Sequence, residues 1–215
     1  MGKILVIGSE KGGVQKSGLS QSLTVYYAIK KNMDVLLVDA DPQATTWDWY
    51  QVRSEDPKLP KINCIQLSGK INQELINQSE RYDLVVVDVG GYDSKPLRSA
   101  MAVADNILIP LRPKRRDLKT LAHMVDLVEQ AQSLNSKLIP KIVLTQCPSL
   151  PSQISRIMGA KEVCNDFGIQ TLNAVTMHRN IYDDCDEGGK TVFETDDLKA
   201  ISEIDAIGNE LEIFK

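Results

Sequence analysis

The stretch from Lys3 to Ser20 reads KILVIGSEKGGVQKSGLS. Residues 4–7 are apolar, a loop with two adjacent glycines follows, and a helix is expected over residues 17–31. A strand that runs through a glycine-containing loop into a helix is typical of a phosphate site, because backbone N–H groups and the helix N-terminus point toward the same place. This stretch therefore predicts an α/β fold with an anion site after its first strand.

The rest of the chain continues the alternation of strand and helix. Further strands are expected at residues 35–38, 62–66, 84–87, 107–109 and 142–144, and further helices at residues 47–53, 72–80, 117–133, 151–167 and 197–212. Most of the strands are continuous apolar runs, which indicates burial on both faces. We therefore expect one domain, residues 1–215, built as a doubly wound, mostly parallel sheet with helices on both faces.

Composition excludes several classes of protein. The net charge is −4, so the chain as a whole has no electrostatic drive toward nucleic acid. The four cysteines form no C-x-x-C pair and the two histidines lie far apart, which argues against a zinc site or a disulfide framework and fits a reducing cytoplasm. We expect no signal segment and no membrane span.

The loop residues suit phosphate chemistry. Gly12 and Gly13 allow close approach of the backbone, Lys16 can neutralise phosphate charge, and Ser17 can offer a hydroxyl to Mg²⁺. The general pattern G-x-x-x-x-G-K-[ST] is not met, because Glu10 and Gln15 occupy its glycine positions. A glycine-rich turn with two solvated lysines is the alternative.

The segment KGGVQKS, residues 11–17, resembles the deviant Walker A loop K-G-G-x-G-K-[ST] of the ParA/MinD superfamily of dimerising ATPases. The resemblance implies a P-loop NTPase fold that binds ATP and Mg²⁺. It implies that Lys11 reaches across a homodimer to the partner's nucleotide and that Lys16 is the ordinary P-loop lysine. The residues that it assigns to the nucleotide are Lys11, Gly12, Gly13, Val14, Gln15, Lys16, Ser17 and Gly18.

Two acidic segments follow in the order that this family has. LLVDADPQATT resembles the D-x-D-P-Q segment, in which Asp41 positions Mg²⁺ and the attacking water while Asp39 supports the loop. LVVVDVGG resembles a Walker B strand, with Asp88 on the metal and a mobile pair of glycines after it. The resemblance thus implies Lys11, Lys16 and Asp41 as catalytic residues, and Ser17, Asp41 and Asp88 as metal residues. Taken alone, an Asp-Pro pair is more typical of a plain turn.

The later segments resemble the same family. VLTQCP resembles the strand whose end faces the adenine, which makes Gln146 and Pro148 candidate base contacts. HRNIYDDCDEGGKTVFE resembles the segment near the dimer interface. The last helix has Leu198, Ile201, Ile204 and Leu211 at helical spacing and mainly acidic polar positions, so it is expected to pack on the core and not on a membrane.

The small plasmid-type ParA proteins are the branch that fits best. That branch implies nonspecific DNA as a partner, association with the nucleoid, and a ParB-like centromere-binding protein that stimulates hydrolysis. The segment RPKRRDLK supplies the best basic cluster for DNA phosphates, with weaker candidates elsewhere. The cluster contains Arg112, Lys114, Arg115, Arg116 and Lys119, and the weaker candidates are Lys137, Lys141 and Lys199.

Three alternatives stay open: a non-enzymatic module with the same fold, a related ATPase that positions another cargo, and a small-molecule kinase or ligase. Gln15 bears on the first. The residue before the P-loop lysine commonly needs a positive φ, which costs a non-glycine residue roughly 1–2 kcal/mol. Gln15 is therefore either a natural variant whose amide replaces a lost contact or an introduced change that impairs the site. The steric argument predicts that Gln15→Gly tightens ATP binding at least several-fold.

Overall fold

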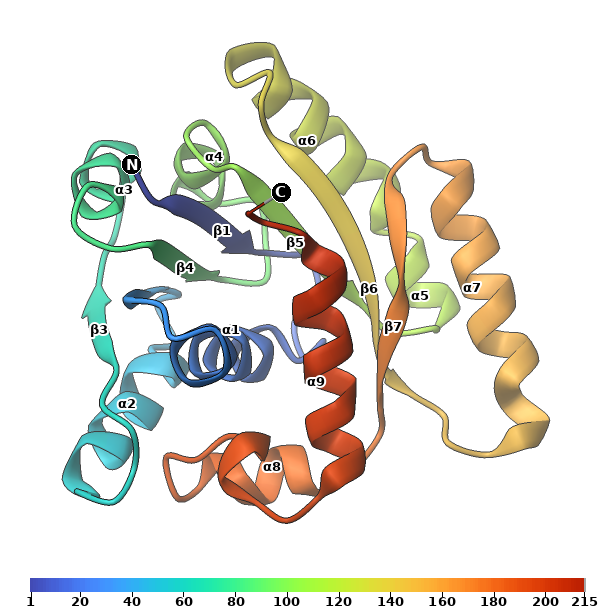
Figure 1. The fold of residues 1–215 in the computed structure, drawn as a ribbon. Coiled ribbons are helices and arrows are strands. Elements are labelled where there is room, and N and C mark those ends of the chain that lie inside the picture. Colours follow the sequence, from blue (N-terminus) through green and yellow to red (C-terminus); the bar gives the residue numbers. More distant parts are fainter. Residues whose placement is uncertain (215) are drawn as a thin grey trace.

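A computed structural model describes residues 1–214 and contains one seven-stranded sheet (Figure 1). The strand order is β3-β2-β4-β1-β5-β6-β7, and every neighbouring pair is parallel. The strands are β1 (Lys3–Ile7), β2 (Val35–Ala40), β3 (Asn63–Gln66), β4 (Leu84–Val89), β5 (Asn106–Leu111), β6 (Ile139–Cys147) and β7 (Gln170–Met177). The doubly wound parallel sheet expected from the sequence is confirmed.

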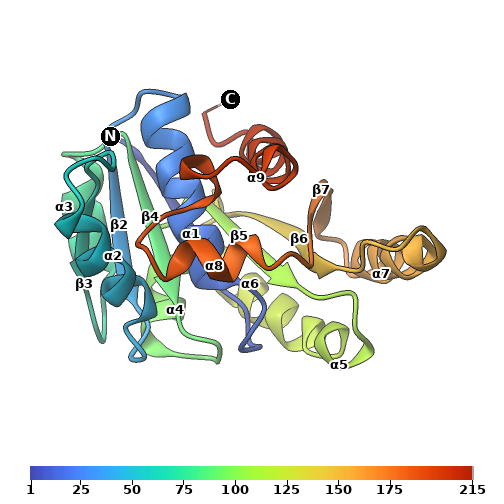
Figure 2. The same ribbon diagram turned by 90° about the horizontal axis from the view of Figure 1, so that it is seen from below.

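Helices cover both faces of this sheet and enclose two separate cores, as Figure 2 shows from below. One face carries α3 (Asn72–Ser79), α4 (Lys95–Met101), α6 (Leu121–Leu134) and α7 (Ile154–Asp166). The other carries α1 (Lys16–Val25), α2 (Thr45–Glu55), α8 (Ile181–Asp186) and α9 (Leu198–Leu211). Short helical segments complete the chain: a π-helix at Tyr26–Lys30, α5 at Arg115–Leu118, and 3₁₀ turns at Pro151–Gln153 and Val192–Glu194.

The register of the central strands brings the acidic segments and the phosphate loop to one edge. Asp39 of β2 lies opposite Asp88 of β4, and Ile7, at the end of β1, also lies opposite Asp88. Because all strands are parallel, their carboxyl ends meet at this edge, which is where open α/β sheets bind ligands. The fold thus places the three motifs side by side.

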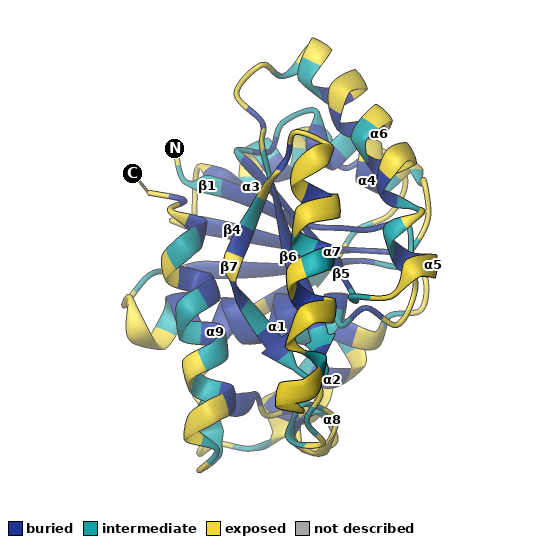
Figure 3. Cartoon of the chain, turned by 90° about the vertical axis from the view of Figure 1, so that its right-hand side faces the viewer, coloured by how far each residue is buried: buried dark blue, intermediate teal, exposed yellow. Residues whose placement is uncertain are grey.

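Some elements differ from the expectation. The sequence did not predict β7, α4 or α8, and the helix expected over residues 117–133 is two helices, α5 and α6. β7 lies at the edge of the sheet, and its burial alternates instead of forming a continuous apolar run (Figure 3). α4 spans only seven residues and starts at Ser94, whose hydroxyl accepts a hydrogen bond from the Leu97 N–H.

The last helix packs on the core, as expected. Ile204, Ile207 and Leu211 of α9 are buried, and Gly208 lies so close to the Tyr26 ring that a Cβ there would be 2.3 Å from it. Leu198 was expected on the same buried face, but it is 78% exposed because it stands at the first turn, beyond the sheet core.

Candidate nucleotide-binding site

The loop between β1 and α1 is held open toward the ligand edge. Gly13 has φ +69°, and Gln15, the residue before α1, has φ 67° and ψ 27°. Gly12 and Gly13 are exposed, and a Cβ built on Gly12 would meet nothing within 4 Å. The positive φ expected at Gln15 is confirmed, and the loop leaves its backbone accessible at a helix N-terminus.

Lys16 lies inside this loop. It is 7% exposed, and its Nζ donates a hydrogen bond to the Lys11 carbonyl at 3.1 Å. Burial lowers the pKa of Lys16, while Asp88 and Asp41 oppose that shift. The ammonium group is thus held against the loop, with the carboxylates of Asp88 and Asp41 near enough to oppose the lowering of its pKa.

The two aspartates after β2 have different surroundings. Asp39 is buried, and both of its carboxylate oxygens accept backbone hydrogen bonds, from the N–H of Asp41 at 3.0 Å and of Trp47 at 2.7 Å. Asp41 is half-buried and accepts one bond, from the Gln43 N–H at 3.0 Å. Asp39 therefore shapes the loop, whereas the Asp41 carboxylate is less buried and accepts fewer backbone hydrogen bonds.

Asp88 at the end of β4 has one oxygen satisfied and one not. Its Oδ2 accepts a hydrogen bond from the Thr46 hydroxyl at 2.6 Å, and its Oδ1 is buried without a partner. Burial raises the pKa of Asp88 to about 6, while the hydrogen bond from the Thr46 hydroxyl, the nearby Ser17 hydroxyl, which is not within hydrogen-bond geometry, and the charge of Lys16 lower it. A buried carboxylate oxygen without a partner costs free energy unless a cation or a donor meets it.

These residues fit Mg²⁺. The partnerless Asp88 oxygen and the Ser17 hydroxyl are hard oxygen ligands of the kind that Mg²⁺ binds. Over residues 1–214 no group of three or more His, Cys, Asp and Glu could hold a metal ion by itself. The ion would therefore take most of its ligands from phosphate and water, as Mg²⁺ usually does.

The loop after β4 lies against the phosphate loop. A Cβ on Gly91 would be 3.0 Å from the Gly12 nitrogen and 3.0 Å from the Lys16 Nζ. A Cβ on Gly90 would be 3.3 Å from the Asp41 Oδ1. A side chain at Gly91 would press on the backbone of the phosphate loop, and one at Gly90 would require the side chains of Asp41 and Tyr92 to shift.

A pocket of about 560 Å³ opens over the phosphate loop. Its lining includes Gly12, Gly13, Gln15, Lys16, Ser17, Gly18, Asp41 and Gln146 from the predicted site. Lys11, Val14, Asp88 and Pro148 do not line it. Lys11 is half-buried and Val14 is fully buried, with its carbonyl accepting a hydrogen bond from the Thr145 hydroxyl.

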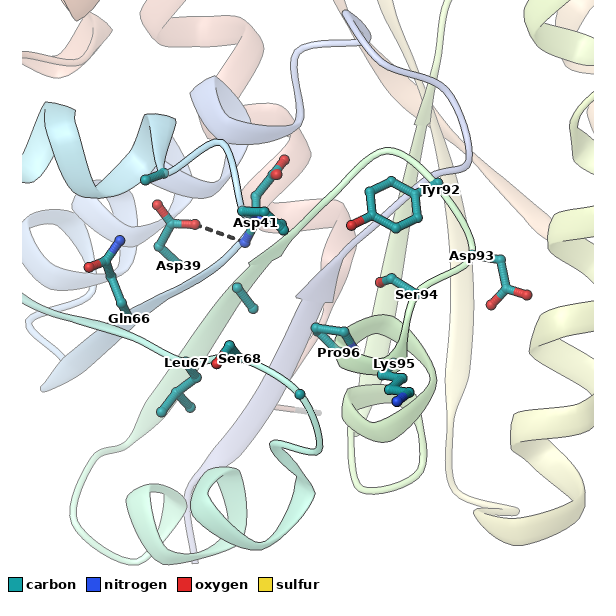
Figure 4. A pocket seen from close by; sticks show the side chains of 14 residues that line it. Asp39, Asp41, Gln66, Leu67, Ser68, Tyr92, Asp93, Ser94, Lys95 and Pro96 are labelled. Atoms are coloured by element: carbon teal, nitrogen blue, oxygen red, sulfur yellow. Dashed lines mark hydrogen bonds between the residues drawn. The ribbon is translucent and has the colours of Figure 1, made fainter.

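The sequence missed part of the wall of this pocket. Tyr92 follows the glycine pair, and Asp183 and Asp186 come from α8, a helix that the sequence did not predict. Burial raises the pKa of Asp186. A second pocket, of about 620 Å³, lies on the other side of Asp41, Pro42 and Tyr92, which line both pockets (Figure 4).

The late segment GGKTVFE anchors α2. Arg53 of α2 is buried, and its guanidinium donates to the Gly189 carbonyl and pairs with Glu194 at 2.7 Å. Gly189 has φ +63°, and a Cβ there would lie 2.4 Å from the Arg53 nitrogen. Glu194 also accepts from the N–H and hydroxyl of Thr191, which completes a capping box. This segment thereby fixes the helix that follows the Asp41 loop.

Most of the predicted basic cluster is exposed. Its four exposed members are Lys114, Arg115, Arg116 and Lys119. Arg112 instead makes two hydrogen bonds to the buried Asp117, at 2.5 and 3.2 Å, and lies near Gly13 of the phosphate loop. Lys141, a weaker candidate, is buried, and its Nζ donates to the carbonyls of Glu210 and Leu211, so its expected role as a surface cation is wrong. Lys137 and Lys199 are exposed.

Residues 5–192 match the family model described as the CobQ/CobB/MinD/ParA nucleotide binding domain. The chain belongs to this family. The resemblance to the ParA/MinD superfamily is therefore confirmed, and with it a nucleotide-binding fold. No helix within residues 1–214 has the length and apolar character that crossing a membrane requires.

Relatives within the family include Protein ParA of Rhizobium radiobacter, 26% identical over 185 residues that cover 83% of this chain and 80% of the relative. The maintenance of carboxysome distribution protein A of Gloeobacter kilaueensis is 28% identical over 173 residues, with 80% and 75% covered. Among solved structures, a putative plasmid partition protein of Borrelia burgdorferi bound to AMPPNP has a TM-score of 0.74 at 20% identity, covering 100% of this chain and 98% of that one. Apo McdA of Cyanothece has a TM-score of 0.78 at 16% identity, covering 98% and 100%.

Proposed function

We propose that this chain is a ParA-type ATPase that hydrolyses ATP with Mg²⁺ and drives the partitioning of DNA. The observation that carries the proposal is the buried Asp88 oxygen without a partner, with the Ser17 hydroxyl near it and the Lys16 ammonium in the same loop. The solved structure of a putative plasmid partition protein bound to AMPPNP supports ATP as the ligand.

Each residue has a part in the proposed reaction. The N–H groups of the loop and Lys16 bind the phosphates, and Ser17, Asp88 and Asp41 hold Mg²⁺, which when bound neutralises charge on the phosphate oxygens. Asp41 orients the water that attacks the γ-phosphate in line. Gln146 contacts the base from the end of β6, and Pro148 follows it. Lys11, which does not line the pocket of its own chain, reaches the nucleotide of a second copy in an ATP-bound homodimer.

ATP binding and turnover test this proposal directly. The wild-type protein is expected to bind ATP in the presence of Mg²⁺ and to release phosphate slowly. Lys16→Ala is expected to weaken binding about tenfold or more, because it removes a charge-assisted contact to phosphate. Isothermal titration calorimetry measures the affinity for ATP, and a phosphate-release assay measures the rate of hydrolysis. An absence of ATP binding by the wild-type protein would favour the non-enzymatic module.

The exposed basic cluster is the proposed DNA surface, and reversing its charge tests that. Changing both Arg115 and Arg116 to Glu is expected to lower affinity for nonspecific duplex DNA at least about tenfold and to flatten its salt dependence, because phosphate contacts release counterions. Fluorescence anisotropy at several salt concentrations measures both effects. The matched control changes Lys58 and Lys61, two exposed lysines on the loop after α2, to Glu and alters the net charge equally. Equal losses in both double variants would mean that net charge, and not this surface, governs DNA binding.

An ATPase that positions another cargo is the second candidate. The relative named for carboxysome distribution favours it. In both candidates the nucleotide chemistry is the same, and a ParB-like centromere-binding protein is the proposed partner only in the first. Stimulation of hydrolysis by the adaptor of a different cargo, with none by a centromere-binding protein, would decide for the second.

A further inference from the structure

One buried hydroxyl connects two residues that line the nucleotide pocket. Thr176 of β7 is fully buried, and its Oγ1 donates to the Gln15 Oε1 at 2.8 Å and accepts from the Gln146 N–H at 3.2 Å. Gln15 and Gln146 both line the pocket, and both have a positive φ, of 67° and 48°. Two backbone positions that L-residues adopt with strain are thus joined through Thr176.

The direction of these bonds fixes the Gln15 amide. The Thr176 hydroxyl has one proton, and because its oxygen accepts from the Gln146 N–H, the proton is left for the Gln15 carbonyl oxygen. The amide nitrogen of Gln15 is therefore the end of the side chain that Thr176 does not engage. A glutamine at this position leaves two N–H donors beside a pocket built for an anion.

We propose that the contact between Gln15 and Thr176 positions the phosphate loop for nucleotide and sets nucleotide affinity in this chain. This inference deepens the proposed function and depends on it for the identity of the ligand. The Gln15 side chain that makes this contact belongs to the left-handed residue of the loop, so the contact supports the conformation that would otherwise be strained. Without the contact the loop would sample other conformations, and apparent affinity would fall with the fraction that is competent.

A double-mutant cycle tests the contact. Gln15→Asn keeps a residue that tolerates positive φ but shortens the side chain by one methylene, so that it no longer reaches Thr176. Thr176→Val removes the hydroxyl, and Thr176→Ser keeps it as the matched control. Each disruptive single variant is expected to weaken Mg²⁺-ATP binding about three- to tenfold, as loss of one net hydrogen bond implies. The double variant is expected to bind ATP about as well as whichever single variant binds it less tightly, because both changes remove the same contact. Thr176→Ser is expected to bind ATP like the wild-type protein.

The Gln15→Gly variant separates two explanations of Gln15. If the positive φ of Gln15 impairs the site, this variant is expected to bind ATP at least several-fold more tightly. The contact with Thr176 predicts the opposite sign, about three- to tenfold weaker binding, since glycine removes the amide and also loosens the loop. Tighter binding by Gln15→Gly, or losses that add in the double variant, would overturn the inference.

A readout without nucleotide separates this inference from the proposed function. Backbone amides of residues 12–18 are expected to exchange hydrogen faster in Gln15→Asn and Thr176→Val than in wild type, with melting temperatures little changed. Unchanged exchange in both variants would overturn the inference even if ATP binds. Faster exchange in the variants together with no ATP binding by the wild-type protein would support the role of the Gln15–Thr176 contact in ordering the loop, and it would reject the proposed function.

Discussion

Asp41→Ala is expected to leave ATP binding nearly intact and to slow hydrolysis about a hundredfold or more, the size of effect that a group orienting the nucleophile usually has. Asp41 is half-buried and accepts only the Gln43 N–H, so its loss removes one local turn bond and leaves the core unchanged. Asp39, with two backbone bonds, continues to hold the loop after β2. Single-turnover phosphate release and a binding titration measure the two quantities separately.

Asp41→Asn is the matched control for the turn. Its side-chain oxygen still accepts from the Gln43 N–H, while the negative charge is gone. If charge and water orientation matter, this variant is expected to be nearly as slow as Asp41→Ala. A normal hydrolysis rate in either variant would remove Asp41 from the catalytic residues, and a normal rate in Asp41→Asn alone would assign its effect to the turn.

Glu194→Ala is expected to lower the free energy of unfolding by about 3–5 kcal/mol, because it leaves the Arg53 guanidinium buried without its counter-charge. Their side chains are 10% and 2% exposed and lie 2.7 Å apart, so little solvent screens the pair. The substitution also removes the acceptor for the Thr191 N–H and hydroxyl. Urea denaturation followed by circular dichroism measures the change.

Glu187→Ala is the control for that loss. Glu187 is exposed and lies in the same segment, and its replacement is expected to change stability by less than about 0.5 kcal/mol. A loss below about 1 kcal/mol in Glu194→Ala would contradict a stabilising role for the pair. Because Arg53 belongs to the helix that follows the Asp41 loop, a destabilised variant is also expected to hydrolyse ATP poorly.

The sequence predicted those parts of the fold and the site that are formed by residues adjacent in the chain. The strand, loop and helix from residue 3 to residue 25 follow from an apolar run, two glycines and a lysine that are adjacent in the chain. Asp39, Asp41 and Asp88 were found because each stands at the end of a buried strand. Gln15 was recognised as a residue with positive φ because the family pattern has glycine there.

Contacts between distant parts of the chain could not be predicted in the same way. Thr176 meets Gln15 across 161 residues, and it lies on an edge strand whose alternating burial carried no clear signal. Asp183 and Asp186 line the pocket from α8, whereas the sequence suggested only that their segment resembles one near the dimer interface. The pairing of Arg112 with Asp117, five residues on in the same basic run, was missed for another reason, because the sequence did not show that Asp117 is buried.

The glycine pair after β4 connects the phosphate loop to the wall of the second pocket. Gly91 lies against Gly12 and Lys16, and the residues that follow it, Tyr92 to Pro96, line the second pocket and start α4. Any ligand that displaces Gly91 from the phosphate loop must therefore shift the wall of a different surface, one loop away. The shape of the second pocket is therefore tied to the position of Gly91 against the phosphate loop.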